Sequence, residues 1–250
     1  MTGPIAVICA LEMELAHVRS RLTSEADVAL VVSGVGMVSA AAAAQDTISR
    51  YAPRAVINCG CAGAHRIDLL PGDLVVGERV VAYDSYRESA TGELEFNGMY
   101  YVEEGEQRHV DSLECDAALV SAAHRVAALV GDGHEPWPVA LGWPDSVAHR
   151  APRVVFGTVA SAERWNRAPA SISALVARHD SLCEDMEAAA IGLVCASHRV
   201  PFLTIKDISN NELLRGTAGW NRLVDEIGSE QIARRAAAFT LGVIRALSCT

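Results

Sequence analysis

The 250-residue chain carries a formal net charge of −10 at pH 7, and half of its residues are hydrophobic. An acidic surface repels phosphate backbones, which argues against nucleic acid as a partner. No apolar run approaches the roughly 18 residues of a membrane-spanning helix, and the start MTGPIAVICA lacks the basic region of a signal peptide. The seven cysteines are odd in number and lack zinc spacing, so we expect reduced thiols in a cytoplasmic protein, without metal or cofactor.

The first third of the chain alternates apolar runs of strand length with helical periodicity. The pattern predicts strands at Ile5–Ala10, Asp27–Ser33, Arg54–Asn58 and Asp73–Ala82, and helices at Leu11–Leu22 and Met37–Arg50. The glycine-rich stretch Gly60–Gly72 is expected to be a loop. Strands that alternate with helices imply an α/β fold with a largely parallel sheet.

The middle of the chain, residues 85–150, is polar, aromatic and rich in turns, and we expect it to form an excursion near a pocket mouth. It includes a predicted helix at Ser112–Val130 and a proline-broken, irregular stretch after it. Regular structure is predicted to resume as a strand at Pro152–Ser161, helices at Ala168–Arg178 and Asp185–His198, a strand at Phe202–Lys206 and a long helix at Ala218–Ser248. With no repeat or linker, residues 1–250 are expected to form one domain.

Two turns near the N-terminus could contribute to a site. Glu12 and Glu14 follow the first strand, although acids in the first turn of a helix are common because they interact favourably with the helix dipole. Gly34 and Gly36 form half of a dinucleotide-binding fingerprint, but Ser39 replaces the third glycine. Tight-turn glycines therefore explain this motif better than a nicotinamide cofactor does.

The segment Leu182–Asn211 is the most informative part of the sequence. Three acids in four residues, Glu184, Asp185 and Glu187, precede an alanine-rich helix and are more than a helix cap requires. A buried strand follows and ends in the polar run Asp207–Asn211. Because ligands of open α/β sheets bind at the carboxyl ends of strands, this segment is predicted to form one wall of a pocket.

The same segments resemble those of bacterial 5′-methylthioadenosine/S-adenosylhomocysteine nucleosidases, within the purine nucleoside phosphorylase and uridine phosphorylase superfamily. The resemblance lies in IAVICALEMEL, VVSGVGMVSAAAAAQ, VINCGCAGAHRIDLLPGDLVVGERVVAYD and LCEDMEAAAIGLVCASHRVPFLTIKDIS, which follow one another at the family's spacing. It covers about Ile5–Asp84 and Pro152–Asn211. It implies a three-layer α/β/α fold with a mixed, mostly parallel twisted sheet, and an N-ribosyl hydrolase activity on a small purine nucleoside.

The resemblance also implies roles for individual residues. Glu14 matches the glutamate that activates water, and Glu187 matches the one that binds the ribose hydroxyls, with Met186 packing on the sugar. Trp165 is the candidate for stacking on the purine, and backbone near Phe202 or Trp165 is expected to read the base edge. The remaining expected substrate contacts are Cys61, Ala62, Gly63 and Ser209.

These roles agree with the chemistry of glycosidic cleavage, which passes through an oxocarbenium-like state. A carboxylate beside the sugar stabilises the positive charge, and a second one can deprotonate the attacking water. The leaving purine must also take up a proton or a strong hydrogen bond at N7.

The family's ISD motif supplies an aspartate for that last role, and this chain has Asn210 there. An amide can donate a hydrogen bond to N7 but cannot give up a proton. Asparagine at this position resembles the 6-oxopurine-specific members of the superfamily, and futalosine hydrolases, which release hypoxanthine, often carry ISN followed by a tryptophan, here Trp220. Alternatively Asp207 could serve as the acid, on the strand face opposite to Asn210.

Two other functions remain open from the sequence. A phosphate-dependent phosphorylase would hold phosphate with cations such as Arg87 and His65, although the first loop carries Glu12 and Glu14 and no arginine before Arg19. A weakly active nucleoside-binding protein would explain the absent aspartate. Family members are commonly dimers or larger, so a homo-oligomer is expected, with the 5′ substituent read by the excursion at 85–101 and the partner chain.

Overall fold

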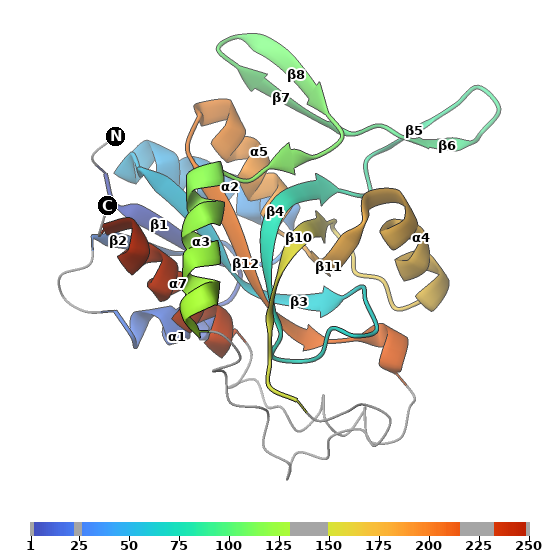
Figure 1. Ribbon diagram of the computed structural model, residues 1–250. Coiled ribbons are helices and arrows are strands. Elements are labelled where there is room, and N and C mark those ends of the chain that lie inside the picture. The colour runs from blue at the N-terminus through green and yellow to red at the C-terminus, as the bar shows by residue number, and fades with distance from the viewer. Residues whose placement is uncertain (1–2, 23–26, 131–149, 216–232, 249–250) are drawn as a thin grey trace.

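The computed structural model describes residues 3–22, 27–130, 150–215 and 233–248. Its centre is a mixed sheet in which the strands follow the order β11-β10-β4-β12-β3-β1-β2, with β9 paired to β4 (Figure 1). The strands of this sheet are β1 (Ile5–Cys9), β2 (Val28–Val32), β3 (Ala55–Ala64), β4 (Leu74–Ala82), β9 (Leu113–Glu114), β10 (Val154–Ser161), β11 (Ser181–Asp185) and β12 (Phe202–Asn210).

Most neighbours in the sheet run parallel, as the alternation of strands and helices predicts. The exceptions are β12 with β4, β11 with β3, and β4 with β9, which are antiparallel. Because β11 pairs with both β10 and β3, the strands β3, β12, β4, β10 and β11 close on themselves. This closure brings the ends of β3, β11 and β12 together.

Helices cover both faces of the sheet (Figure 1). On one face α7 (Arg234–Ser248) packs against α1 (Glu12–Arg19) and α3 (Ala117–Val130), and on the other α2 (Met37–Tyr51) packs against α5 (Ala188–His198). The helix α4 (Pro169–His179) lies beside β11, and a short 3₁₀ helix, η2 (Glu212–Leu214), follows β12. The core between these layers consists of buried aliphatic and alanine side chains of the strands and helices. The three-layer α/β/α architecture is therefore confirmed.

The excursion at 85–110 forms two small antiparallel hairpins, β5 (Tyr86–Glu88) with β6 (Leu94–Phe96) and β7 (Met99–Glu103) with β8 (Glu106–Val110). Both project from the body of the molecule in Figure 1. The irregular stretch expected after Val130, Trp220 and residues 218–232 of the expected helix Ala218–Ser248 lie outside the described residues, and the rest of that helix is present as α7. Within the described residues, none of the helices has the length and apolar character that crossing a bilayer requires.

Several predicted boundaries are wrong. The strand expected at Phe202–Lys206 continues to Asn210, and the helix expected from Ser112 begins at Ala117, after β9. Two further errors hide functional groups. The expected loop from Gly60 is in fact the end of β3, which continues to Ala64. Here the glycine serves close approach: a Cβ at Gly60 would lie 2.9 Å from Glu14 Oε1. The expected helix start at Asp185 is the end of strand β11, and α5 begins only at Ala188. The acids before it therefore lie at a strand end and not on a helix.

Candidate active site

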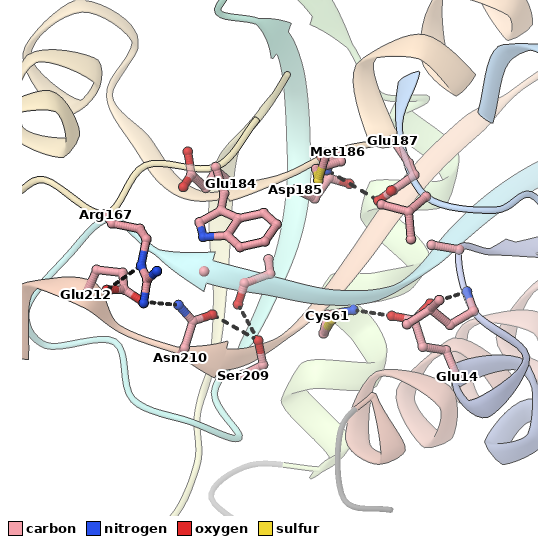
Figure 2. A pocket seen from close by; sticks show the side chains of 16 residues that line it. Glu14, Cys61, Arg167, Glu184, Asp185, Met186, Glu187, Ser209, Asn210 and Glu212 are labelled. Atoms are coloured by element: carbon pink, nitrogen blue, oxygen red, sulfur yellow. Dashed lines mark hydrogen bonds and ion pairs between the residues drawn. The ribbon is translucent and has the colours of Figure 1, made fainter. Parts of the chain in front are cut away.

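A cavity of about 440 Å³ opens where the strand ends meet, a size typical of small-molecule sites. It is lined by residues that follow or end β1, β2, β3, β10, β11 and β12 (Figure 2). They are Ala10, Leu11, Glu14, Val35, Cys61, Ala62, Gly63, Trp165, Arg167, Glu184, Asp185, Met186, Glu187, Ser209, Asn210 and Glu212. The pocket thus unites the first loop, the glycine turn, the Trp165 loop and the segment Leu182–Asn211, whereas none of its described lining residues comes from the excursion at 85–110, which was expected near its mouth.

Glu14 forms one end of this pocket from the first turn of α1, and its side chain is nearly inaccessible, with 2% of the residue exposed. One carboxylate oxygen accepts a hydrogen bond from the backbone N–H of Leu11 at 3.0 Å. The other accepts from the backbone N–H of Cys61 at 3.0 Å, across the gap that Gly60 leaves open. Two main-chain donors, one at the start of α1 and one in β3, therefore fix the carboxylate at the cavity wall.

Glu187 lies at the N-cap of α5, and its carboxylate joins two of the motifs. It accepts from the backbone N–H of Gly36 at 3.0 Å and from that of Met186 at 3.3 Å. Gly36 has a φ of +99°, a conformation that favours glycine, so the glycine turn is needed to present this N–H. Burial, followed by the negative charge of Asp185, raises the pKa of Glu187 to about 7.

A buried ion pair lies among these acids. Lys206 on β12 is 1% exposed, and its ammonium is 2.7 Å from a carboxylate oxygen of Asp185. Burial acts to lower the pKa of Lys206, but the charges of Asp185, Glu187 and Glu14 outweigh it and raise that pKa. Asp185 also accepts from the Ser161 hydroxyl at 2.5 Å and from the backbone N–H of Ala188 at 3.0 Å. One lysine thus offsets part of the negative charge at the acidic end of the pocket.

At the opposite end, Ser209 and Asn210 both line the cavity. Their placement on one side follows from a register shift between Ile208 and Asn210 in the pairing of β12 with β3, which interrupts the alternation of faces. Strict alternation of faces, which the interpretation of Asp207 assumed, therefore ends at this register shift. Trp165 lines the same cavity and is 60% exposed.

Asp207 lies away from this cavity. It is 2% exposed and accepts a hydrogen bond at 3.1 Å from the backbone N–H of Arg235, in the first turn of α7. Burial raises the pKa of Asp207 to about 7, but its carboxyl group lies beneath α7 and not beside the pocket. The alternative in which Asp207 replaces the family's acid is therefore corrected by the structure.

Phe202 is also misplaced as a base-reading position, because it begins β12 and the pocket lies at the other end of that strand. It lines a separate surface cavity with Gly192 and Val200. The remaining predicted contacts Cys61, Ala62, Gly63 and Met186 do line the pocket.

The two possible phosphate ligands are not at the pocket either. His65 is buried, with Nδ1 2.8 Å from the Ser181 hydroxyl, and Arg87 pairs with Glu95 on an exposed hairpin at 2.7 Å. Among the described lining residues Arg167 is the only cation, against five carboxylates. A pocket of this charge repels phosphate and suits water as the nucleophile.

This geometry agrees with comparisons to known proteins. A family model described as Phosphorylase superfamily matches residues 12–245. The chain belongs to the phosphorylase superfamily. A 5′-methylthioadenosine/S-adenosylhomocysteine nucleosidase from Shewanella piezotolerans is 29% identical over 226 residues, which cover 83% of this chain and 86% of the relative.

Solved structures share the fold of this phosphorylase-superfamily chain. A mutant of the Helicobacter pylori nucleosidase MTAN with 5′-methylthioadenosine in the active site has a TM-score of 0.73 at 19% identity, covering 98% of this chain and 99% of the other. Native futalosine hydrolase from Helicobacter pylori strain 26695 also has a TM-score of 0.73 at 19% identity, covering 97% of each chain. At these identities the likeness establishes a common architecture. The family model is what confirms the superfamily predicted from the motifs.

Sequence reasoning missed a buried network behind the base end. Glu184 accepts from both the backbone and the side-chain nitrogen of Asn166, at 2.5 and 2.7 Å, and from the Tyr83 hydroxyl at 2.9 Å. Burial acts to raise the pKa of Glu184, but the nearby imidazole of His65, at 3.3 Å, helps to hold that pKa low. Asn166 lies between the pocket residues Trp165 and Arg167, so this network anchors the loop that carries them.

Arg167 and Glu212 were also missed. Both line the pocket, and Glu212 begins the short helix after β12 (Figure 2). The sequence signal was weak, because Arg167 follows a loop motif and Glu212 lies just past the end of the family resemblance.

Proposed function

We propose that this protein is a purine nucleosidase that hydrolyses the N-glycosidic bond of a 5′-modified purine nucleoside to free base and sugar. The observation that carries the proposal is the pairing of two buried carboxylates, Glu14 and Glu187, in one pocket whose far end offers Trp165 and Asn210. The similarity to methylthioadenosine/S-adenosylhomocysteine nucleosidases and to futalosine hydrolase supports the same reaction class.

In this proposal Glu187 binds the ribose. Its carboxylate is held by the N–H groups of Gly36 and Met186 and can still accept hydrogen bonds from sugar hydroxyls, which needs its ionised form. Met186 supplies an apolar surface beside the ring. The negative charge also stabilises the oxocarbenium-like state as the bond to the base breaks.

Glu14 is the proposed general base. It takes a proton from a water molecule while the water oxygen bonds to the anomeric carbon, and the electron pair of the broken bond leaves with the purine. The backbone donors from Leu11 and Cys61 fix its direction, so no side-chain motion is needed for the step. Trp165 offers a flat face for the base, and Asn210 donates a hydrogen bond to it.

The test is release of free base from a panel of 5′-modified adenosines and inosines, measured with and without inorganic phosphate. Release that is independent of phosphate is expected, because the pocket is acidic. A strict phosphate requirement would instead establish a phosphorylase. Binding of a nucleoside with no release, even at high enzyme concentration, would establish a nucleoside-binding protein.

Two further properties belong to the same proposal. The protein acts in the cytoplasm, and it assembles as a homodimer or larger homo-oligomer. Sedimentation of the purified protein over a range of concentrations tests the assembly, and a monomer at all concentrations would contradict it.

A further inference from the structure

The base end of the pocket contains a polar cluster of Asn210, Glu212 and Arg167, in which Glu212 and Arg167 have no part in the proposed reaction (Figure 2). Glu212 Oε2 accepts from Arg215 at 2.8 Å and lies 3.9 Å from Arg167 Nε. Glu212 Oε1 faces the amide nitrogen of Asn210 at 3.3 Å. Two guanidinium groups therefore neighbour this carboxylate, whose oxygens accept hydrogen bonds.

This carboxylate decides which way the amide of Asn210 faces. The Ser209 hydroxyl lies 3.1 Å from Asn210 Oδ1 and 3.3 Å from the carbonyl oxygen of Ala62. A hydroxyl fits either orientation of the amide, since it can donate to Oδ1, or accept from an NH₂ group while donating to Ala62. Glu212 fits only one, because an amide oxygen turned toward it would meet a carboxylate oxygen. Asn210 is thereby fixed with its NH₂ group toward Glu212.

Arg167 reaches the same end from the opposite loop. Its neighbour Asn166 is anchored through two hydrogen bonds to Glu184, so the loop that carries Arg167 and Trp165 is held in place. The base end thus presents a fixed amide donor, a guanidinium and one carboxylate. Among the described lining residues, the base end has an amide at position 210, where the family's ISD motif has an acid that could protonate N7.

A 6-oxopurine matches this arrangement in two ways. Its N7 and O6 are both acceptors and its N1–H is a donor, whereas a 6-aminopurine has a donor at position 6 and an acceptor at N1. When the glycosidic bond breaks without protonation, the base leaves as an anion whose charge spreads onto O6. Donors and a cation placed at that oxygen stabilise the charge as it develops.

Building on the proposed nucleosidase function, we propose that Glu212 and Arg167 select a 6-oxopurine base, Glu212 by fixing the amide of Asn210 and Arg167 by donating to the oxygen at position 6. Glu212 is a positioning residue for Asn210, while Arg167 contacts the base. Nothing in the resemblance to the nucleosidase family predicts either role.

The experiment measures the preference for a 6-oxopurine over a 6-aminopurine in two ways. Dissociation constants for hypoxanthine and adenine are measured by calorimetry, and kcat/KM is measured for 5′-methylthioinosine and 5′-methylthioadenosine, which differ only at position 6. The wild type is expected to favour the 6-oxo member of each pair. Glu212→Gln and Arg167→Met are each expected to reduce this preference about 10-fold to 100-fold, the effect of one hydrogen bond to a charged group.

Arg215→Gln is the matched control, because it removes the other ion-pair partner of Glu212 without touching the cavity lining, and the preference should change less than about 3-fold. Asn210→Asp is expected to gain a new substrate preference, which a misfolded protein could not show. The neighbouring Glu212 carboxylate raises the pKa of the new acid, so the variant can protonate N7 and should now favour 5′-methylthioadenosine.

The two proposals fail in different ways. Absence of turnover on every nucleoside contradicts the nucleosidase function, while the binding ratio of hypoxanthine to adenine still tests the selection of the base. A wild-type preference for adenine, or an unchanged preference in both Glu212→Gln and Arg167→Met, overturns the inference even if the enzyme is fully active.

Discussion

The two ends of the pocket are built from different kinds of contact. At the sugar end, Glu14 and Glu187 are almost completely buried, and backbone N–H groups hold their carboxylates. At the base end, Arg167 and Trp165 are exposed and Glu212 is held by other side chains. Main-chain donors cannot be exchanged by substitution, whereas side-chain partners can. The sugar end is thus suited to a constant reaction and the base end to a specificity that can change.

Among the variants that test this comparison, Glu14→Gln is expected to have the largest effect. The amide cannot take a proton from water, so kcat is expected to fall by about 10²-fold to 10⁴-fold. Glu12→Gln is the matched control, because Glu12 lies on the same helical turn but is exposed and pairs only with Arg19 outside the cavity. Initial rates of base release and thermal melting are measured for both. Equal losses in the two variants would remove Glu14 from its proposed role.

The ion pair of Lys206 with Asp185, beneath the sugar end, is expected to stabilise the folded protein. Lys206→Met leaves Asp185 buried without its cation, which is expected to cost about 3–5 kcal/mol of unfolding free energy in urea titrations. Lys206→Arg keeps the charge and should recover most of that loss, even though the larger group must repack. If Lys206→Met melts like the wild type, the charge balance inferred for this end of the pocket is wrong.

The same contrast explains how far the sequence could predict the structure. The sugar end was found because its acids follow strand ends in motifs of fixed spacing, and the glycines at Gly36 and Gly60 mark close approaches of the backbone. The irregularity before Asn210 could not be predicted, because a register shift depends on how β12 pairs with β3.

Other failures share that cause. Acids and alanines dominate the segment around Asp185 and predict a helix start there, but pairing of β11 with β10 and β3 overrides that local preference. Arg167 and Glu212 lie 45 residues apart in the sequence, and only the tertiary fold brings them together, at 3.9 Å. Long-range side-chain pairs of this kind leave no periodic signal.

A pH profile tests the sugar end with a smaller expected effect. The pKa of Glu187 is raised to about 7, so below that pH the carboxyl is protonated and loses an acceptor for the ribose hydroxyls. We expect kcat/KM to fall as the pH drops through about 7, approaching tenfold per unit in acid. In Glu187→Gln this step should vanish and KM should rise about 10-fold to 100-fold. An unchanged acid limb in that variant would assign the titration to another group.

The smallest expected effect belongs to the base end. Trp165→Ala removes the stacking face, which contributes roughly 1–3 kcal/mol per base in comparable sites, so KM should rise about tenfold while kcat changes little. Trp165→Phe keeps an aromatic face and serves as the control. Because a π-face does not distinguish an oxygen from an amino group at position 6, both methylthionucleosides should lose affinity equally. A loss confined to one of them would mean that Trp165 helps to select the base, and the division between a stacking residue and the Arg167 and Glu212 pair would then have to be redrawn.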